Sequence, residues 1–252
     1  PGTEHRLAPG QLWPADTSVI RYYNPRTLFP RLPYPMKIHL IAAARPNFMK
    51  IAPLYHALTR EAWAEPVIVH TGQHYDQRMS DIFFNQLGLP EPHFYLGVGG
   101  GSHTQTTAKI MLEFEKVMLK EQPDLVLVVG DVNSTIACAL VASKLNTKVA
   151  HVEAGLRSGD HRMPEEINRI LTDRISDLMF VTEQSGMVHL AKEGVADEKI
   201  HFVGNVMIDS LVRFREKAKQ STILSDLGVD PREYVLMTMH RPANVDNEKS
   251  LG

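Results

Sequence analysis

The sequence predicts an α/β protein built on a parallel β-sheet. Short apolar runs typical of strands alternate along the chain with longer segments that have helical periodicity. The run at Asp124–Val129 is apolar after its first residue, as in a strand that is covered on both faces. Such alternation favours right-handed βαβ units, whose ligands bind beyond the carboxyl ends of the strands.

The expected elements follow one another regularly from Met36 onward. Strands are predicted at Lys37–Ala43, Pro66–Thr71, Asp124–Val129, Lys148–Val152 and Leu178–Thr182. Helices are predicted at Phe48–Arg60, Asp76–Leu87, Thr104–Lys120, Asn133–Leu145 and Pro164–Ser176. The last of these has proline in its first turn with acidic residues after it, which suits a helix start.

Three regions can be separated by pattern. Residues 1–35 hold seven of the sixteen prolines and show no period, so we interpret them as a disordered or added extension, such as a fusion remnant. Residues 36–205 are predicted to form the first domain. Residues 206–252 carry a helix near Met207–Lys219, a linker-like stretch at Asp226–Pro231 and a strand at Tyr234–Met239. We interpret them as a linker and the start of a truncated second domain.

Composition excludes several classes of protein. Lys and Arg number 27 against 29 Asp and Glu, so a nucleic-acid or membrane-surface protein is not expected. The single cysteine, Cys138, rules out a disulfide framework, favours the cytoplasm and is expected to be buried helix packing. No apolar run is long enough to span a bilayer. His70 and His74 are the one histidine pair four residues apart and no C-x-x-C motif exists, so no metal site is expected.

Two carboxylates follow neighbouring predicted strands. Asp131 comes directly after Asp124–Val129 and Gly130, and Glu153 follows the strand at Lys148–Val152. One crevice could therefore hold both, and crowded carboxylates suit acid/base chemistry. The alternatives are that Asp131 is a helix N-cap and that Glu153 forms a surface pair with Arg157.

Positive charge is predicted beside these carboxylates. Arg45 and Lys50 lie at the turn after the first strand, where a strand-to-helix turn aims N–H groups at a phosphate or diphosphate. The alternative is a pair of ordinary surface cations. Glu165, Asn168 and Arg169 share one helix face, either at the site or as helix-dipole acids with an i,i+4 pair.

Further candidates stand elsewhere in the chain. His240 and Arg241 end the strand at Tyr234–Met239 and would face the first domain across a cleft. Histidine can transfer protons or contact phosphate near neutral pH. The glycine-rich segment at residues 97–102 is expected to be a mobile loop, with a phosphate cradle as the alternative.

Seven motifs in order carry a resemblance to a known family. They are IAAARPNFMKIAPL, TGQH, VVGDVNSTIA, HVEAGLRSGD, MPEEINRILTD, GNVMIDSL and TMHRPANVD. From Met36 to Gly252 the chain resembles the non-hydrolysing UDP-N-acetylglucosamine 2-epimerases. The resemblance implies a Rossmann-like, doubly wound parallel sheet in a GT-B type arrangement, of which the second domain is only begun here.

The resemblance also implies an activity: interconversion of UDP-GlcNAc and UDP-ManNAc without NAD or a metal. UDP would be eliminated across C1–C2 of the sugar to leave a glycal, and then added back after protonation of the other face. Asp131, Glu153 and Glu165 would be the acid/base carboxylates. Arg45, Lys50, His240 and Arg241 would contact the diphosphate and sugar, with His240 also among the catalytic residues. The implied setting is a cytoplasmic homodimer in polysaccharide biosynthesis, with a UDP-sugar as ligand and no nucleic acid or membrane partner.

The match leaves alternatives open. The family's remaining C-terminal part supplies most nucleotide contacts, so a chain ending at Gly252 is expected to bind substrate poorly and turn over little. Tyr75-Asp76 after TGQH departs from the pattern associated with activation by a second UDP-GlcNAc. The other readings are an epimerase of a UDP-diacetamido uronic acid, a hydrolysing relative, and an inactive fragment that only binds or dimerises.

Overall fold

The computed structural model describes residues 34–43, 45–72 and 84–238. The described residues separate into two units, one ending at Val212 and the other beginning at Arg213. No helix among these residues is long and apolar enough to cross a membrane.

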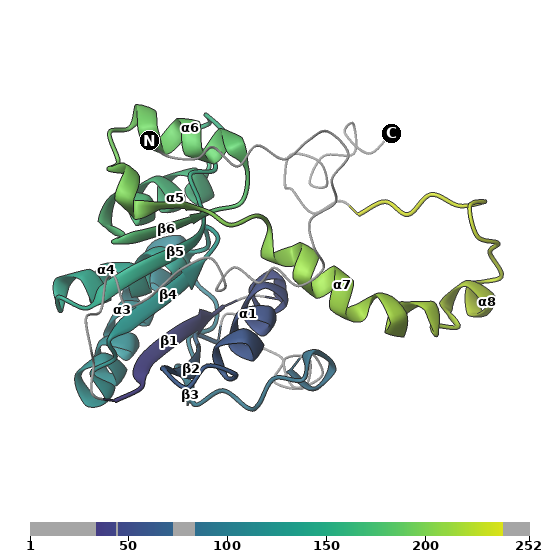
Figure 1. The fold of residues 1–252 in the computed structure, drawn as a ribbon, viewed down its shortest axis with the longest axis horizontal. Helices are drawn as coiled ribbons and strands as arrows, with labels where there is room; N and C mark the ends of the chain where they lie inside the picture. The colour runs from purple at the N-terminus through teal and green to yellow at the C-terminus, as the bar shows by residue number, and fades with distance from the viewer. Residues whose placement is uncertain (1–33, 44, 73–83, 239–252) are drawn as a thin grey trace. The chain divides into compact units, whose positions relative to one another are not determined.

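The first unit is built on one seven-stranded sheet in the order β3-β2-β1-β4-β5-β6-β7 (Figure 1). Its strands are β1 (Met36–Ala42), β2 (Ala64–His70), β3 (Phe94–Tyr95), β4 (Leu125–Val129), β5 (Lys148–Ala154), β6 (Leu178–Val181) and β7 (Ile200–Phe202). Every neighbouring pair is parallel. The chain winds outward in one direction from β1 to β3 and in the other from β4 to β7, so the predicted doubly wound α/β class is confirmed.

Helices cover both faces of this sheet. The helices of the two units are α1 (Arg45–Leu58), α3 (His103–Glu121), α4 (Asn133–Lys144), α5 (Pro164–Ile175), α6 (Gln184–Lys192), α7 (Val206–Lys219) and α8 (Ile223–Leu227), with a 3-10 turn at Asp197–Lys199. In the view of Figure 1, α1 lies in front of the sheet, whereas α3 and α4 lie behind it.

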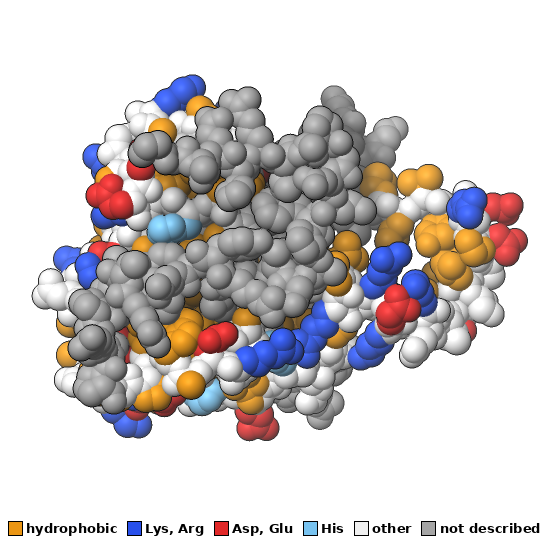
Figure 2. Space-filling model, in the orientation of Figure 1, with side chains coloured by type: hydrophobic (Ala, Val, Ile, Leu, Met, Phe, Trp, Pro, Cys, Tyr) orange, Lys and Arg blue, Asp and Glu red, His pale blue; other side chains and the backbone are white. Residues whose placement is uncertain are grey.

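Figure 2 shows Lys and Arg side chains over α7, whose exposed positions include Arg213, Arg215, Lys217 and Lys219.

Local sequence explains the best-formed helix. Ser102 caps α3 by accepting a hydrogen bond from the Gln105 N–H, while the Gln105 side chain accepts one from the Ser102 N–H. Its buried stripe consists of Thr106, Ile110, Phe114 and Met118, at helical spacing. Cys138 is buried in α4 as predicted, and burial raises the pKa of its thiol.

The elements that the sequence failed to predict are mostly short. Strands β3 and β7 have two and three residues, too few for a periodic pattern to show. Helix α6 was also missed. Of the predicted helix Asp76–Leu87, the described residues 84–87 are helical.

Near the end of the chain, the predicted strand is wrong, and the predicted linker overlaps a helix at its start. Residues 234–238 form no strand, and the side chains of Val235 and Leu236 are 93% and 82% exposed. A strand needs a hydrogen-bonding neighbour, and the described residues supply none for this segment. The linker predicted at Asp226–Pro231 begins inside α8, which Gly228 ends in the left-handed conformation.

Candidate active site

The candidate site lies where β1, β4 and β5 end, at the point where the sheet changes its direction of winding. Three predicted residues reach this edge from three elements: Lys50 from α1, Asp131 from the turn after β4, and Glu153 from β5. The Asn47 side chain donates a 3.0 Å hydrogen bond to the carbonyl oxygen of Val129. This bond ties the start of α1 to the end of β4.

Lys50 and Glu153 form the central ion pair. The Lys50 Nζ atom lies 2.5 Å from Glu153 Oε2, and the two side chains are 16% and 12% exposed. The alternative pairing of Glu153 with Arg157 is therefore wrong. Arg157 pairs instead with Asp173 and Glu193, at 2.8 and 2.7 Å.

The backbone at Glu153 is unusual. Its φ angle is 71°, in the left-handed region, and the pairing of β5 with β6 shifts by one residue between Val152 and Ala154. A side-chain-bearing residue in this region costs about 1–2 kcal/mol, so the surroundings must hold it there. Bulges of this kind commonly re-aim a side chain next to a functional site.

Gly130 forms the floor beneath the ion pair. Its φ angle is 72°, and a Cβ atom there would lie 3.5 Å from both Glu153 Oε2 and Lys50 Nζ. A Cβ at 3.5 Å would make ordinary contacts, so it is the left-handed backbone, and not a lack of space, that favours glycine here.

Asp131 is held by helix α5. Arg169 donates a short hydrogen bond from Nη2 to Asp131 Oδ2, and Asn168 Nδ2 donates one of 2.9 Å to the Asp131 carbonyl oxygen. The alternative role of Asp131 as a helix cap is not found, because the N-cap of α4 is Val132 and no side chain caps that helix. The predicted shared face of Asn168 and Arg169 is thus directed at Asp131.

Glu166 is a site residue that the sequence reading missed. Its carboxylate is 1% exposed and accepts hydrogen bonds from the N–H groups of Ser158 and Gly159, while Arg169 Nη1 lies 2.8 Å away. Burial alone would raise the pKa of Glu166, but these N–H groups and the Arg169 charge together lower it. The i,i+3 spacing of Glu166 and Arg169 in the sequence is the pattern that could have indicated this ion pair.

Glu165 is less clearly placed. It is half-buried, and no hydrogen bond or ion pair described in the structure joins it to Asp131 or Glu153. Arg169 pairs with Glu166 at i+3 and not with Glu165 at i+4. The acid/base role of Glu165 stays a prediction.

A second buried network lies behind the carboxylates, and the sequence reading missed it too. His151 Nε2 lies 2.8 Å from the Gly130 carbonyl oxygen, and His151 Nδ1 lies 2.6 Å from Asp173 Oδ1. The other oxygen of Asp173 accepts hydrogen bonds from the Gly155 N–H and Arg157 Nη1, at 3.0 and 2.8 Å. His151 and Asp173 are 0% and 1% exposed.

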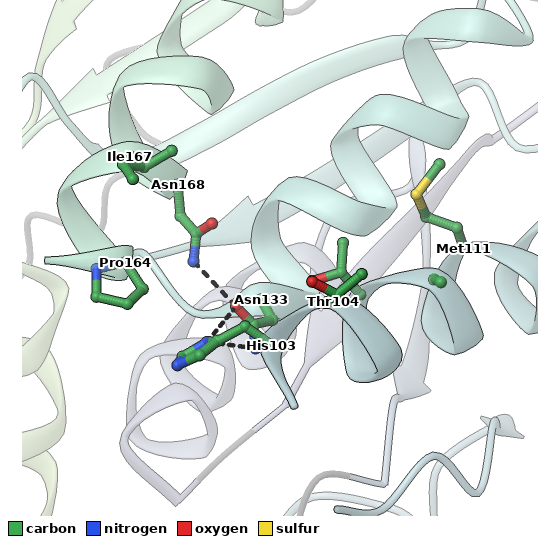
Figure 3. Close-up of a pocket in the computed structure, with 9 residues that line it drawn as sticks. His103, Thr104, Met111, Asn133, Pro164, Ile167 and Asn168 are labelled. Atoms are coloured by element: carbon green, nitrogen blue, oxygen red, sulfur yellow. Dashed lines mark hydrogen bonds between the residues drawn. The ribbon is translucent and has the colours of Figure 1, made fainter. Parts of the chain in front are cut away.

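A groove of about 440 Å³ opens beside Asp131, between α3 and the first turns of α4 and α5 (Figure 3). Its polar end holds His103, Asn133 and Asn168, joined by hydrogen bonds of 3.1–3.3 Å. Met111 and Ile167 supply apolar surface. Asn168 therefore belongs to the groove and to the support of Asp131 at once.

The remaining candidates lie outside the described residues. They are the side chain of Arg45 and the whole of His240 and Arg241. In the described part of the chain, no group of three or more His, Cys, Asp or Glu residues could hold a metal ion.

Comparison with known proteins shows the family of the chain. A family model described as UDP-N-acetylglucosamine 2-epimerase matches residues 56–252. The chain belongs to this epimerase family. It is 48% identical over 218 residues to a UDP-N-acetylglucosamine 2-epimerase homolog of Methanococcus maripaludis, a match covering 86% of this chain and 60% of the relative.

Two further relatives are named for particular UDP-sugars. A UDP-2,3-diacetamido-2,3-dideoxy-D-glucuronate 2-epimerase of Pseudomonas aeruginosa is 46% identical over 84% of the chain and 59% of its own length. The crystal structure of Methanocaldococcus jannaschii UDP-GlcNAc 2-epimerase in complex with UDP-GlcNAc and UDP is similar at a TM-score of 0.79, with 44% identity over 85% of this chain and 59% of that one. The chain thus spans about 60% of the length of these relatives.

Proposed function

We propose that the chain is the N-terminal portion of a non-hydrolysing UDP-sugar 2-epimerase, an isomerase that interconverts UDP-GlcNAc and UDP-ManNAc. The observation that carries the proposal is the Lys50–Glu153 ion pair at the switch point of the sheet, with Asp131 at the end of the neighbouring strand, in a chain that belongs to this epimerase family. Residues 36–205 would be the first domain and residues 206–252 the linker and the beginning of a second. Helix α7, which begins at Val206, carries the chain from one unit into the next.

The proposed reaction needs a base, an acid and a cation. A carboxylate takes the proton from C2 of the sugar while the C1–O bond breaks, and UDP leaves with the bonding electrons. The glycal left behind is protonated at C2 from its other face, and UDP returns to C1. Asp131 and Glu153 are the proposed acid/base pair, because they lie at the ends of neighbouring strands.

The cations around these carboxylates support the scheme. Glu153 is paired with Lys50, and Asp131 is paired with Arg169. Each carboxylate therefore has its own cation, which lets two negative charges share one crevice. Lys50 is the proposed contact for the leaving diphosphate, where a fixed positive charge stabilises the transition state. Roles for Arg45, Glu165, His240 and Arg241 remain as the sequence predicts them.

The identity of the sugar is proposed with one rival. The Pseudomonas aeruginosa relative, named for a diacetamido glucuronate, is 46% identical, close to the 45% of the Methanocaldococcus jannaschii relative named for UDP-N-acetylglucosamine. UDP-GlcNAc is preferred because several relatives carry that name.

The test is a conversion assay on the chain at the full length of its relatives, with each UDP-sugar in turn. UDP-ManNAc forming from UDP-GlcNAc, with the glycal and UDP as minor products, is expected. Asp131→Asn and Glu153→Gln should each lower kcat by about a hundredfold or more. The matched controls Asp177→Asn and Glu113→Gln change carboxylates away from this edge and should keep the activity.

Other outcomes separate the alternatives. Conversion of the diacetamido sugar alone would move the protein to the rival substrate, and release of free ManNAc would make it a hydrolase. A protein that binds UDP but converts neither sugar would be a binding module and would contradict the proposal.

We further propose a homodimer in the cytoplasm. Exposed apolar side chains on α3 and α5 support self-association: Leu112, Leu119, Ile167 and Leu171. Light scattering should give twice the chain mass for the wild type, and a monomer mass throughout the micromolar range would contradict the dimer.

A further inference from the structure

A histidine and an aspartate are buried together next to the backbone that carries the candidate carboxylates. His151 on β5 and Asp173 on α5 lie 2.6 Å apart, at 0% and 1% exposure. Neither is among the residues proposed to touch the sugar. Burying two charges usually contributes less stability than apolar packing of the same volume, so such a pair calls for another explanation.

The two hydrogen-bond partners of His151 decide which of its ring nitrogens donate. The Gly130 carbonyl oxygen can only accept, so Nε2 must carry a proton. Asp173 is ionised at neutral pH: burial alone would raise its pKa, but His151, Arg157 and the Gly155 N–H together lower it. An ionised carboxylate also only accepts, so the hydrogen bond to Asp173 is made when Nδ1 donates.

The same pair makes hydrogen bonds to two backbone positions near Glu153, at Gly130 and at Gly155. His151 holds the Gly130 carbonyl oxygen, and the Gly130 N–H donates to the Val152 carbonyl oxygen at 3.1 Å, so the turn leading to Asp131 is fixed at both polar groups. Asp173 holds the Gly155 N–H at 3.0 Å, two residues beyond Glu153. Glu153 is the residue with the left-handed backbone between these anchors.

We propose that the buried His151–Asp173 ion pair positions the two acid/base carboxylates by clamping the Gly130 turn and the Glu153 bulge against each other. His151 and Asp173 are positioning residues that act through Asp131 and Glu153. The assignment of these carboxylates to chemistry rests on the proposed epimerase function, but the clamp itself rests on the contacts alone.

The first test needs no activity. In the 252-residue chain labelled with ¹⁵N, both ring nitrogens of His151 should carry protons at pH 7. The Lys50 ammonium group should exchange slowly with water, because Glu153 is held against it. In Asp173→Asn the second ring proton should be lost, and the Lys50 ammonium should exchange about tenfold faster as the bulge loosens.

A matched control separates positioning from simple destabilisation. Asp177→Asn removes a charged acceptor for the Val149 N–H at the opposite end of the same strand. It should lower stability without changing the Lys50 exchange rate. If Asp173→Asn does not fold, His151→Gln replaces it, because glutamine can still donate to the Gly130 carbonyl but cannot match the charge of Asp173.

The second test measures catalysis in the chain at the full length of its relatives. Asp173→Asn and His151→Gln should each lower kcat by about tenfold or more while KM changes less than twofold, as expected when transition-state geometry is lost and binding is kept. A singly protonated His151 in the wild type, or Lys50 exchange that is equal in Asp173→Asn and Asp177→Asn, would overturn the clamp. A wild-type protein without activity would overturn the proposed function and leave the first test of the clamp intact.

Discussion

Two histidines in this sheet are equally buried and differ in almost everything else. His39 on β1 and His151 on β5 are both 0% exposed. Among the described residues, neither ring nitrogen of His39 has a hydrogen-bond partner, and its ring centroid lies 6.2 and 6.3 Å from those of Phe94 and Phe114. Both ring nitrogens of His151 meet acceptors.

The difference shows that the position of a histidine along its strand decides which groups surround its ring. His39 lies in the middle of β1, where its neighbours are apolar side chains, and burial lowers its pKa to about 4. His151 lies near the carboxyl end of β5, where the chain turns and offers a free carbonyl oxygen and a buried carboxylate. The same side chain is thus a neutral core residue in one place and a hydrogen-bonded support of the backbone in the other.

The largest effect on stability is expected from removing the Asp173 carboxylate, which pairs with His151. Asp173→Ala removes a buried carboxylate that pairs with His151 and Arg157 and accepts from the Gly155 N–H, so the free energy of unfolding should fall by about 3–5 kcal/mol. Urea denaturation at pH 7 measures it. Asp160→Ala, which removes an exposed pair with Arg162, should leave it nearly unchanged. Equal effects of the two substitutions would show that the buried pair does not support the fold.

Because burial lowers the pKa of His39, we expect the folded chain to lose stability at acidic pH. The pKa of His39 is lower in the folded chain than the ordinary histidine value of 6.5, so the unfolded chain binds the proton first. The stability that depends on neutral His39 is complete above pH 6.5 and is lost as pH falls from 6.5 to about 4, amounting to about 3 kcal/mol.

Denaturation across this pH range tests that prediction. His39→Leu should remove this part of the pH dependence while other titrating groups continue to act. A pH profile that is the same in the wild type and in His39→Leu would contradict it.

A smaller effect is expected at the candidate site. A double-mutant cycle with Lys50→Met and Glu153→Gln should give a coupling energy of about 1–2 kcal/mol, since both side chains are mostly buried. The same cycle on the exposed Glu113–Lys116 pair should give about 0.5 kcal/mol or less. Coupling no larger at the site than at the surface would mean that the Lys50–Glu153 contact is not held.

Much of the sheet could be predicted because its strands are continuous apolar runs. Asp131, Glu153 and Lys50 could be predicted as well, because residues after parallel strands gather at one edge. The hydrogen-bond and ion-pair partners of the side chains were harder to predict from the sequence. Glu165 and Glu166 are adjacent in sequence, and which of them faces the loop at Ser158 depends on how α5 is rotated on the sheet.

The His151–Asp173 network could not be read from the sequence for the same reason. The two residues are 22 positions apart on different elements, and neither has a local pattern that signals a partner. The strand predicted at Tyr234–Met239 failed for a related reason, since a strand depends on neighbours that its own residues do not reveal.

The central claim, that the strand-end carboxylates move the proton at C2, is tested most directly by isotope exchange. The chain at the full length of its relatives is incubated with UDP-GlcNAc in D₂O, beside Glu153→Gln and the control Glu113→Gln. Deuterium should enter C2 of both UDP-sugars in the wild type and the control, and about a hundredfold more slowly in Glu153→Gln. UDP-ManNAc that forms without deuterium at C2, or Glu153→Gln that exchanges as fast as the wild type, would contradict the claim.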